Sequence, residues 1–251
     1  MKKTLVMFRN GSDLDLILDS YKNLNHLYGF KIVPIYIKNI AYTIPIRETI
    51  INSGIASKML HEIEDKFIDT IRDKLLQYNI HEKLIIETEI SGHSVKNHLK
   101  YCDLLLLDQD FILNDLFLDI LKNLYRPVII LRNKPLNFSN IALISNDGVK
   151  VNKSAYNFIS LFNDINKINM FTWNYNDDSN YLKDLLIDKG LEISVKRFFS
   201  DTNDISGVYS ILNNYNLVIM GNLSRSFFFE KITNRMGLNF LENINTSIFI
   251  G

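Results

Sequence analysis

The sequence predicts an α/β protein in which two tandem, doubly wound halves each contain a five-stranded, mostly parallel sheet flanked by helices. Apolar strand patterns alternate with amphipathic helix patterns in residues 1–133, and the same order recurs in residues 138–251. Each half opens with an apolar strand that ends at a small polar turn. Each also contains a strand that is apolar at every position, Leu104–Leu107 and Leu217–Met220, as expected for a strand buried on both faces.

The first half shows helical spacing of apolar residues wherever a crossover helix is needed. Leu14, Ile17, Tyr21 and Leu24 fall on one helix face, and Gly29 is typical of a helix stop. A second helix carries one apolar stripe: Met59, Ile63, Phe67, Ile71 and Leu75. The predicted strands are 4–8, 31–37, 83–90, 104–107 and 127–131, and the predicted helices are 13–28, 56–78, 94–101 and 111–124.

The second half repeats this order after a linker over 133–137 that contains Pro135. Its predicted strands are 141–145, 168–173, 191–198, 217–220 and 247–250, and its predicted helices are 151–163, 179–189, 205–214 and 227–243. Because crossovers between parallel strands are right-handed, a doubly wound sheet is the topology expected for each half.

Composition excludes several classes of function. Lys+Arg and Asp+Glu both number 28, so the neutral chain gives no support for nucleic-acid or membrane-surface binding. The apolar run after the first lysines is too short for a secretory signal, so a cytoplasmic protein is expected. The single cysteine, Cys102, adjoins a predicted buried strand and is interpreted as an inert core thiol.

Ligands of open parallel sheets bind beyond the carboxyl ends of the strands, which directs attention to two turns of the second half. One turn is Asn146-Asp147-Gly148, and the other begins at Gly221 and runs through Arg225-Ser226. These residues resemble a universal stress protein domain, in which an Asp-Gly turn follows the first strand and a glycine-rich phosphate loop follows the fourth. The resemblance extends to both halves as a tandem protein and implies an adenine nucleotide alpha hydrolase-like, Rossmann-like fold.

The resemblance also implies the residues that would contact a nucleotide, ATP or AMP with Mg²⁺: Asp147, Gly148, Trp173, Gly221, Ser224, Arg225, Ser226 and Asn234. Ser224 and Asn234 stand where the family has glycines, which admit phosphate to bare backbone N–H groups. We therefore expect no cofactor and no catalytic residues, in a binding or signalling module of the stress response. The alternative is an ATP- or AMP-binding switch with at most slow hydrolysis.

The first half departs further from the family. Asn10-Gly11-Ser12 lacks the carboxylate that would hold a ribose, and Asp108-Gln109-Asp110 is interpreted as a solvated acidic turn. Reading Asp108 and Asp110 as Mg²⁺ ligands supplies too few oxygens for a hard cation. No metal site is expected, because neither paired cysteines nor a His-Glu-x-x-His motif is present.

The resemblance further implies an intramolecular pseudo-dimer. Strands 127–131 and 247–250 would pair antiparallel and remove two apolar edges from solvent. The partner expected beyond this pairing is an unidentified protein. A homodimer is added if the Phe227–Phe229 cluster is exposed.

Overall fold

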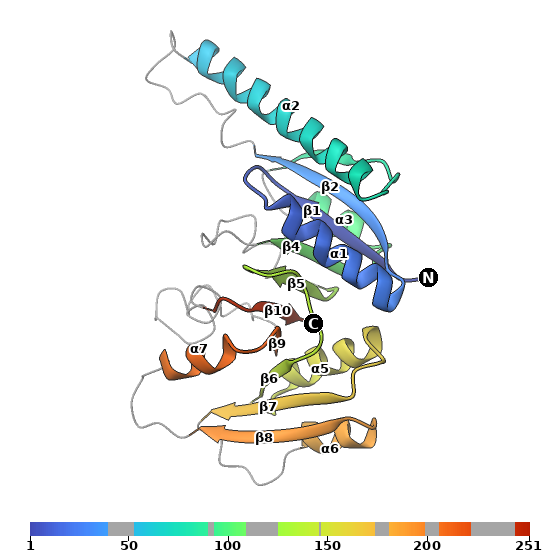
Figure 1. Cartoon of the computed structure of the whole chain (residues 1–251), viewed down its shortest axis with the longest axis vertical. Helices are drawn as coiled ribbons and strands as arrows, with labels where there is room; N and C mark the ends of the chain where they lie inside the picture. Colours follow the sequence, from blue (N-terminus) through green and yellow to red (C-terminus); the bar gives the residue numbers. More distant parts are fainter. Residues whose placement is uncertain are drawn as a thin grey trace.

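The structure is a computed structural model that describes residues 1–39, 53–89, 93–108, 125–145, 147–173, 181–198, 206–221 and 244–251. Its ten strands form one sheet in the order β3-β2-β1-β4-β5-β10-β9-β6-β7-β8 (Figure 1). The strands are β1 Lys3–Phe8, β2 Lys31–Asn39, β3 Ile85–Glu89, β4 Leu104–Asp108, β5 Val128–Leu131, β6 Ile141–Ser145, β7 Lys167–Trp173, β8 Glu192–Phe198, β9 Leu217–Met220 and β10 Ser247–Ile250.

All neighbouring strands are parallel except β5 and β10, which are antiparallel and lie at the centre. The strand order is therefore the same on both sides of the centre, read outward. The described helices are α1 Leu14–Tyr28, α2 Ser53–Gln77, α3 His93–Leu99, α5 Val149–Leu161, α6 Tyr181–Asp188 and α7 Ser206–Leu212. The predicted α/β fold with a large, mostly parallel sheet is confirmed.

The first helix shows how local sequence fixes an element. The side chain of Asp13 accepts a hydrogen bond from the Leu16 N–H, so it caps the first turn of α1. Gly29 ends the helix with φ of 67°, a left-handed conformation that glycine adopts without a Cβ clash, and its N–H donates to the Asn25 carbonyl oxygen. The predicted helix stop is confirmed.

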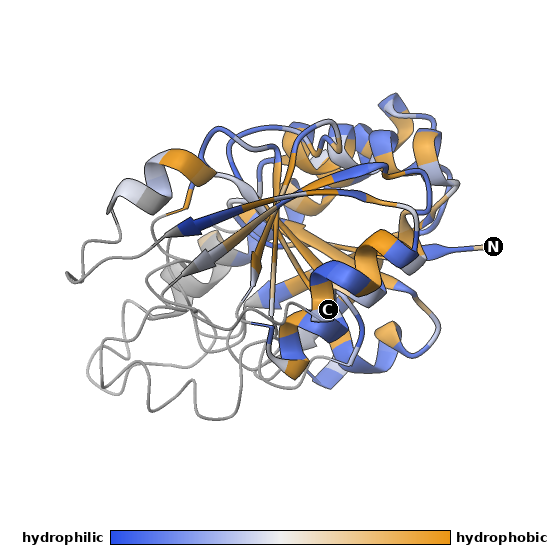
Figure 2. Ribbon diagram, turned by 90° about the horizontal axis from the view of Figure 1, so that it is seen from below, coloured by the Kyte–Doolittle hydropathy of each residue, from blue (hydrophilic) through white to orange (hydrophobic). Residues whose placement is uncertain are grey.

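Two apolar cores cover the two faces of the sheet. Figure 2 shows that the central strands consist mostly of hydrophobic residues. One core contains side chains of α1, α2, α5 and α6, and the other contains side chains of α3 and α7. Leu104 and Leu106 of β4 enter the first core, whereas Leu105 and Leu107 enter the second. Every residue of β4 and β9 is buried, as the uninterrupted apolar runs predict. Cys102 lies in the second core, where burial raises the pKa of its thiol to about 11.

Helix α2 departs from its predicted stripe. Ile71 and Leu75 are buried, but Met59 and Ile63 are 58% and 52% exposed. The first turns of α2 extend past the edge of the sheet (Figure 1). The apolar stripe of this helix is therefore longer than the part of the helix that packs on the sheet. Among the described residues, no helix, α2 included, is both long enough and apolar enough to span a membrane.

The central seam joins β5 to β10. Ile130 is opposite Ile248, Ile129 is opposite Phe249, and Val128 is opposite Ile250. The predicted antiparallel pairing of these strands is present. Ile129 and Ile248 are therefore not direct partners, and their side chains lie in different cores. The alternating pattern of apolar residues along each strand does not determine this register.

An aromatic cluster reinforces the seam on one face. Phe162 is the C-cap residue of α5, and its ring lies 4.9 Å from both Tyr28 and Phe158. Phe138, which directly follows the linker, contacts Tyr28 and Phe162 at 5.0 and 4.8 Å, and Phe249 of β10 contacts Phe158 at 5.1 Å. The cluster thus joins α1 of the first half to α5 of the second.

We expect Phe249→Ala to lower the free energy of unfolding by about 3–5 kcal/mol, because it leaves a cavity where the seam meets the aromatic cluster. Urea denaturation monitored by circular dichroism measures the change. The control is Tyr181→Ala, which removes an aromatic side chain that is 72% exposed and should have little effect. Equal stability of the two variants would contradict this role of the seam.

Candidate functional site

The carboxyl edge of the second half brings together three of the predicted site residues. Asp147 and Gly148 follow β6, and Gly221 follows the neighbouring strand β9. A Cβ on Gly221 would lie 3.1 Å from the Val151 backbone nitrogen and 3.3 Å from the Lys150 Cβ. Gly221 therefore serves close packing between the end of β9 and the first turn of α5.

Asp147 has a role that its place in the sequence does not reveal. Its Oδ2 accepts the N–H of Tyr181 at 3.0 Å, and its Oδ1 accepts the N–H of Leu182 at 2.9 Å. These are the first two residues of α6, 34 and 35 positions further along the chain. The carboxylate thus caps α6 and complements the positive end of its dipole.

The backbone around Asp147 is held in an uncommon conformation. Asp147 has φ of 51°, in the left-handed region, and its N–H donates to Ser145 Oγ at 3.0 Å. Asn152 Nδ2 donates to the carbonyl oxygens of Asp147 and Gly148, each at 3.1 Å, and lies 3.3 Å from Asp147 Oδ1. These bonds fix the turn so that the carboxylate reaches α6.

Most of the remaining predicted site residues lie outside the described part of the chain. Trp173 ends β7 as predicted, but its side chain lies outside the described residues. Ser224, Arg225, Ser226 and Asn234 also lie outside them, as do Phe227–Phe229. Gly148 is the N-cap of α5 with φ of −75°, a value open to any residue, and its cap has no side-chain hydrogen bond.

In the first half, the carboxylate at this edge belongs to Asp108 at the end of β4, and its predicted solvation is wrong. It is only 5% exposed because it continues the buried strand β4, where it pairs with Leu131 of β5. Ser12 Oγ donates to its Oδ1 at 3.0 Å, and the Asp13 N–H donates to its Oδ2 at 3.1 Å. The carboxylate therefore holds the turn after β1 and the start of α1; Asp110 lies outside the described residues.

Two arginines add positive charge at this edge. Arg9 Nε lies 3.8 Å from Asp108 Oδ1, within ion-pair distance. Arg132 directly follows β5 and is only 3% exposed, and its backbone N–H donates to Ser247 Oγ of β10 at 3.3 Å. Burial lowers the pKa of the Arg132 guanidinium to about 10, which still leaves it charged at neutral pH. Sequence reasoning missed both arginines, because neither belongs to a recognisable motif.

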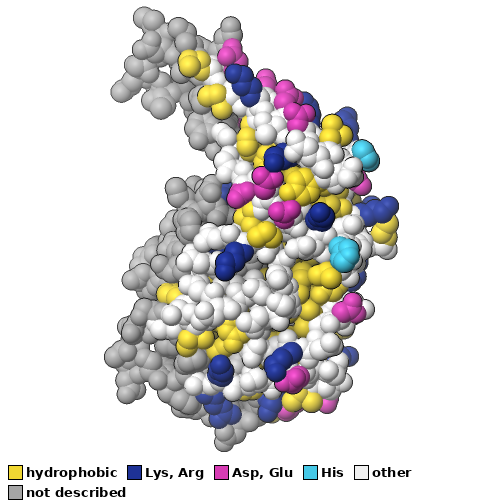
Figure 3. All heavy atoms as spheres, in the orientation of Figure 1, with side chains coloured by type: hydrophobic (Ala, Val, Ile, Leu, Met, Phe, Trp, Pro, Cys, Tyr) yellow, Lys and Arg dark blue, Asp and Glu magenta, His cyan; other side chains and the backbone are white. Residues whose placement is uncertain are grey.

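The described residues do not supply a metal centre. Within those ranges, no three His, Cys, Asp or Glu side chains gather closely enough to hold a metal ion. On the face drawn in Figure 3, basic and acidic side chains are interspersed, without a continuous basic patch. The carboxyl edges of the two halves therefore remain the candidate sites.

We expect Asp147→Ala to lower the free energy of unfolding by about 1–3 kcal/mol, because the α6 cap is lost and alanine is strained at positive φ. Asp147→Asn keeps one side-chain carbonyl oxygen and tolerates this φ, so it should cost less. Urea denaturation of both variants gives the comparison. An alanine variant as stable as the wild type would show that the cap contributes nothing.

We expect Asp108→Ala to lower the free energy of unfolding by about 3–5 kcal/mol, the range found when one partner of a buried ion pair is removed. The matched control is Asp69→Ala, which breaks the exposed Asp69–Arg72 pair. That control should cost less than about 1 kcal/mol. Thermal and urea melts of the two variants test the difference, and similar losses in both would refute the anchoring role of Asp108.

No protein-family model matches the sequence, and a sequence search finds no match among curated proteins. Solved structures do match. A universal stress protein from Archaeoglobus fulgidus DSM 4304 is 10% identical, with a TM-score of 0.60 over 98% of this chain and 94% of that chain. A functionally unknown protein from Pseudomonas aeruginosa PAO1 is 9% identical, with a TM-score of 0.56 over 99% and 92% of the two chains.

A protein from Pseudomonas aeruginosa UCBPP-PA14, provisionally named a universal stress protein, is 10% identical and has a TM-score of 0.55 over 99% and 92% of the chains. Identities this low establish the fold and nothing finer. The chain has the α/β, Rossmann-like fold seen in solved universal stress proteins.

Proposed function

We propose that this chain is a non-catalytic binding or signalling module, similar to universal stress proteins, that works without a nucleotide cofactor. One observation carries the proposal: the Asp147 carboxylate, which the family resemblance assigns to a ribose, already accepts the N–H groups of Tyr181 and Leu182. A nucleotide that required this carboxylate would have to compete with the α6 cap.

The first half supports the same proposal. Its carboxylate at this edge, Asp108, is buried and bound to Ser12, Asp13 and Arg9. A carboxylate beside the turn after β1 repels phosphate, whereas a phosphate site presents free backbone N–H groups to its ligand. Both edges therefore use the protein's own carboxylates for structural contacts.

The glycine positions of the second half point in the same direction. Ser224 and Asn234 place side chains where the family resemblance requires bare backbone. Gly221 remains, but its lack of a Cβ is explained by its contact with α5. In this proposal, the residues that match the family motif have structural roles: Gly221 packs against α5, and Asp147 caps α6.

The proposal places the molecule in the cytoplasm as an intramolecular pseudo-dimer of two domains, 1–133 and 138–251, that engages a protein partner during stress. The β5–β10 pairing supports this arrangement because it occupies both apolar edges within one chain. The equal numbers of basic and acidic residues support a partner other than nucleic acid or membrane.

One observation favours the alternative, an ATP- or AMP-binding switch with slow hydrolysis. Asp147, Gly148 and Gly221 do lie together at the carboxyl edge of β6 and β9, where ligands of this class of sheet bind. In that alternative, the nucleotide would take the Asp147 carboxylate away from α6.

We expect isothermal titration with ATP–Mg²⁺, and separately with AMP, to show no binding tighter than about 1 mM, an affinity of about 4 kcal/mol. The matched control is Asp147→Ala, which should give the same result, and neither protein should release phosphate from ATP. Micromolar binding by the wild type that disappears in Asp147→Ala would establish the nucleotide switch in place of our proposal.

A further inference from the structure

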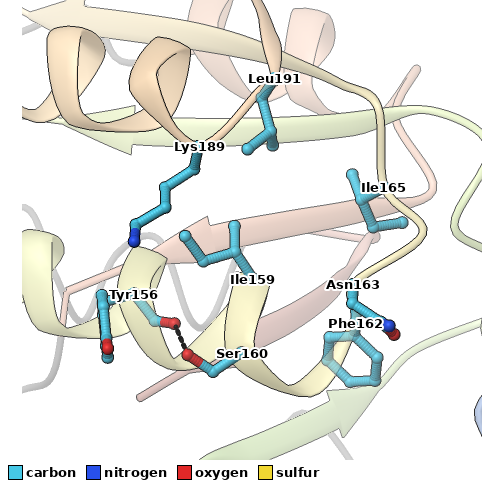
Figure 4. A pocket seen from close by; sticks show the side chains of 8 residues that line it. All are labelled: Tyr156, Ile159, Ser160, Phe162, Asn163, Ile165, Lys189 and Leu191. Atoms are coloured by element: carbon cyan, nitrogen blue, oxygen red, sulfur yellow. Dashed lines mark hydrogen bonds between the residues drawn. The ribbon is translucent and has the colours of Figure 1, made fainter.

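A cavity of about 230 Å³ lies on the second half, away from the carboxyl edge (Figure 4). Its walls come from the end of α5, the segment that leads into β7, and the segment between α6 and β8. The amino ends of β7 and β8 adjoin it, whereas Asp147 and Gly221 lie at the carboxyl ends of β6 and β9. The cavity is therefore distinct from the candidate nucleotide site.

The inner wall of the cavity is apolar. Phe162 and Leu191 are buried, and Ile159 and Ile165 are partly buried beside them. Figure 4 shows Ile159, Ile165 and Leu191 directed into the space between α5 and the segments that lead into β7 and β8. This wall favours an apolar group, because its transfer from water removes apolar surface from solvent.

Two hydrogen-bond donors lie at one end of the apolar wall. The Lys189 side chain extends across the cavity toward Tyr156, which lies on α5 (Figure 4). Within the described part of the chain, neither the Lys189 ammonium nor the Tyr156 hydroxyl has a hydrogen bond or an ion pair. Ser160, also on the rim, already donates its hydroxyl proton to the Tyr156 carbonyl oxygen at 2.8 Å.

We propose that this cavity binds a small monocarboxylate with an apolar tail, its carboxylate at Lys189 and Tyr156 and its tail along Ile159 and Ile165. An ammonium and a phenol are donors suited to a carboxylate, and none of the described lining residues is acidic. The volume lies below the roughly 300–1,000 Å³ of pockets for drug-sized ligands, so the tail is short.

The surrounding helix ends oppose negative charge, and they oppose a phosphate dianion more strongly than a single carboxylate. The cavity adjoins the C-terminal ends of α5 and α6, where the helix dipoles carry partial negative charge. One lysine can neutralise one carboxylate there. A phosphate would bring a second charge without a backbone N–H cluster to receive it.

The test is titration of the full chain with sodium octanoate. Isothermal calorimetry measures the binding, and NMR measures the amide chemical-shift changes at residues 156–165 and 189–191. We expect saturable binding, shifts at these positions, and about tenfold weaker binding in Lys189→Met, the effect of losing one charge-assisted hydrogen bond. Methionine keeps the apolar stem of the lysine, and the exposed position leaves folding intact.

Lys183→Met is the matched control, because Lys183 belongs to α6 but does not line the cavity. It should bind octanoate like the wild type. The neutral probe 1-octanol should bind the wild type and Lys189→Met equally, and acetate should bind far more weakly than octanoate. Octanoate affinity that is unchanged in Lys189→Met, or shifts confined to other parts of the molecule, would overturn the proposal.

Discussion

The antiparallel pairing of β5 with β10 is the interaction on which the rest of the structure depends. Without it, each half would end in a short, largely apolar edge strand with unpaired backbone groups. With it, ten strands become one sheet, and α1 and α5 are placed on the same face. Phe138, which follows the linker, and Phe249 of β10 then join one aromatic cluster with Tyr28 and Phe162.

At the carboxyl edges of both halves, carboxylates of the protein itself accept hydrogen bonds from backbone N–H groups. A turn after a parallel strand leaves backbone N–H groups that need acceptors, and a ligand oxygen often supplies them. Here Asp108 satisfies the Asp13 N–H, and Asp147 satisfies those of Tyr181 and Leu182. At both edges the carboxylates therefore make structural contacts within the protein.

The inferred carboxylate cavity would give the second half a ligand at its opposite edge. Its lining residues come from segments that connect helices to strands, and such segments carry function more often than the strands that they join. A ligand there would contact the end of α5, whose C-cap residue Phe162 belongs to the aromatic cluster at the seam. The cavity is thus connected by packing to the junction between the halves.

The sequence alone determined the order of the described strands and helices and the burial of β4 and β9, because period and apolar character are local properties; the helices predicted at 111–124 and 227–243 lie outside the described residues. It also predicted the helix stop at Gly29. Its prediction for Asp108 failed, since an aspartate after a leucine run appears solvated until Ser12, Asp13 and Arg9 are brought beside it. The exposure of Met59 and Ile63 likewise depended on where the sheet ends beneath α2.

Only the tertiary structure decided what Asp147 does. The two backbone N–H groups that donate to its carboxylate belong to residues 34 and 35 positions further along the chain. No local motif could therefore connect the turn after β6 to the start of α6. The seam register was also a tertiary decision, because strand alternation fixes which face a side chain occupies but not which residue stands opposite it. Local pattern therefore determined the elements, and long-range contacts determined the chemistry available at their ends.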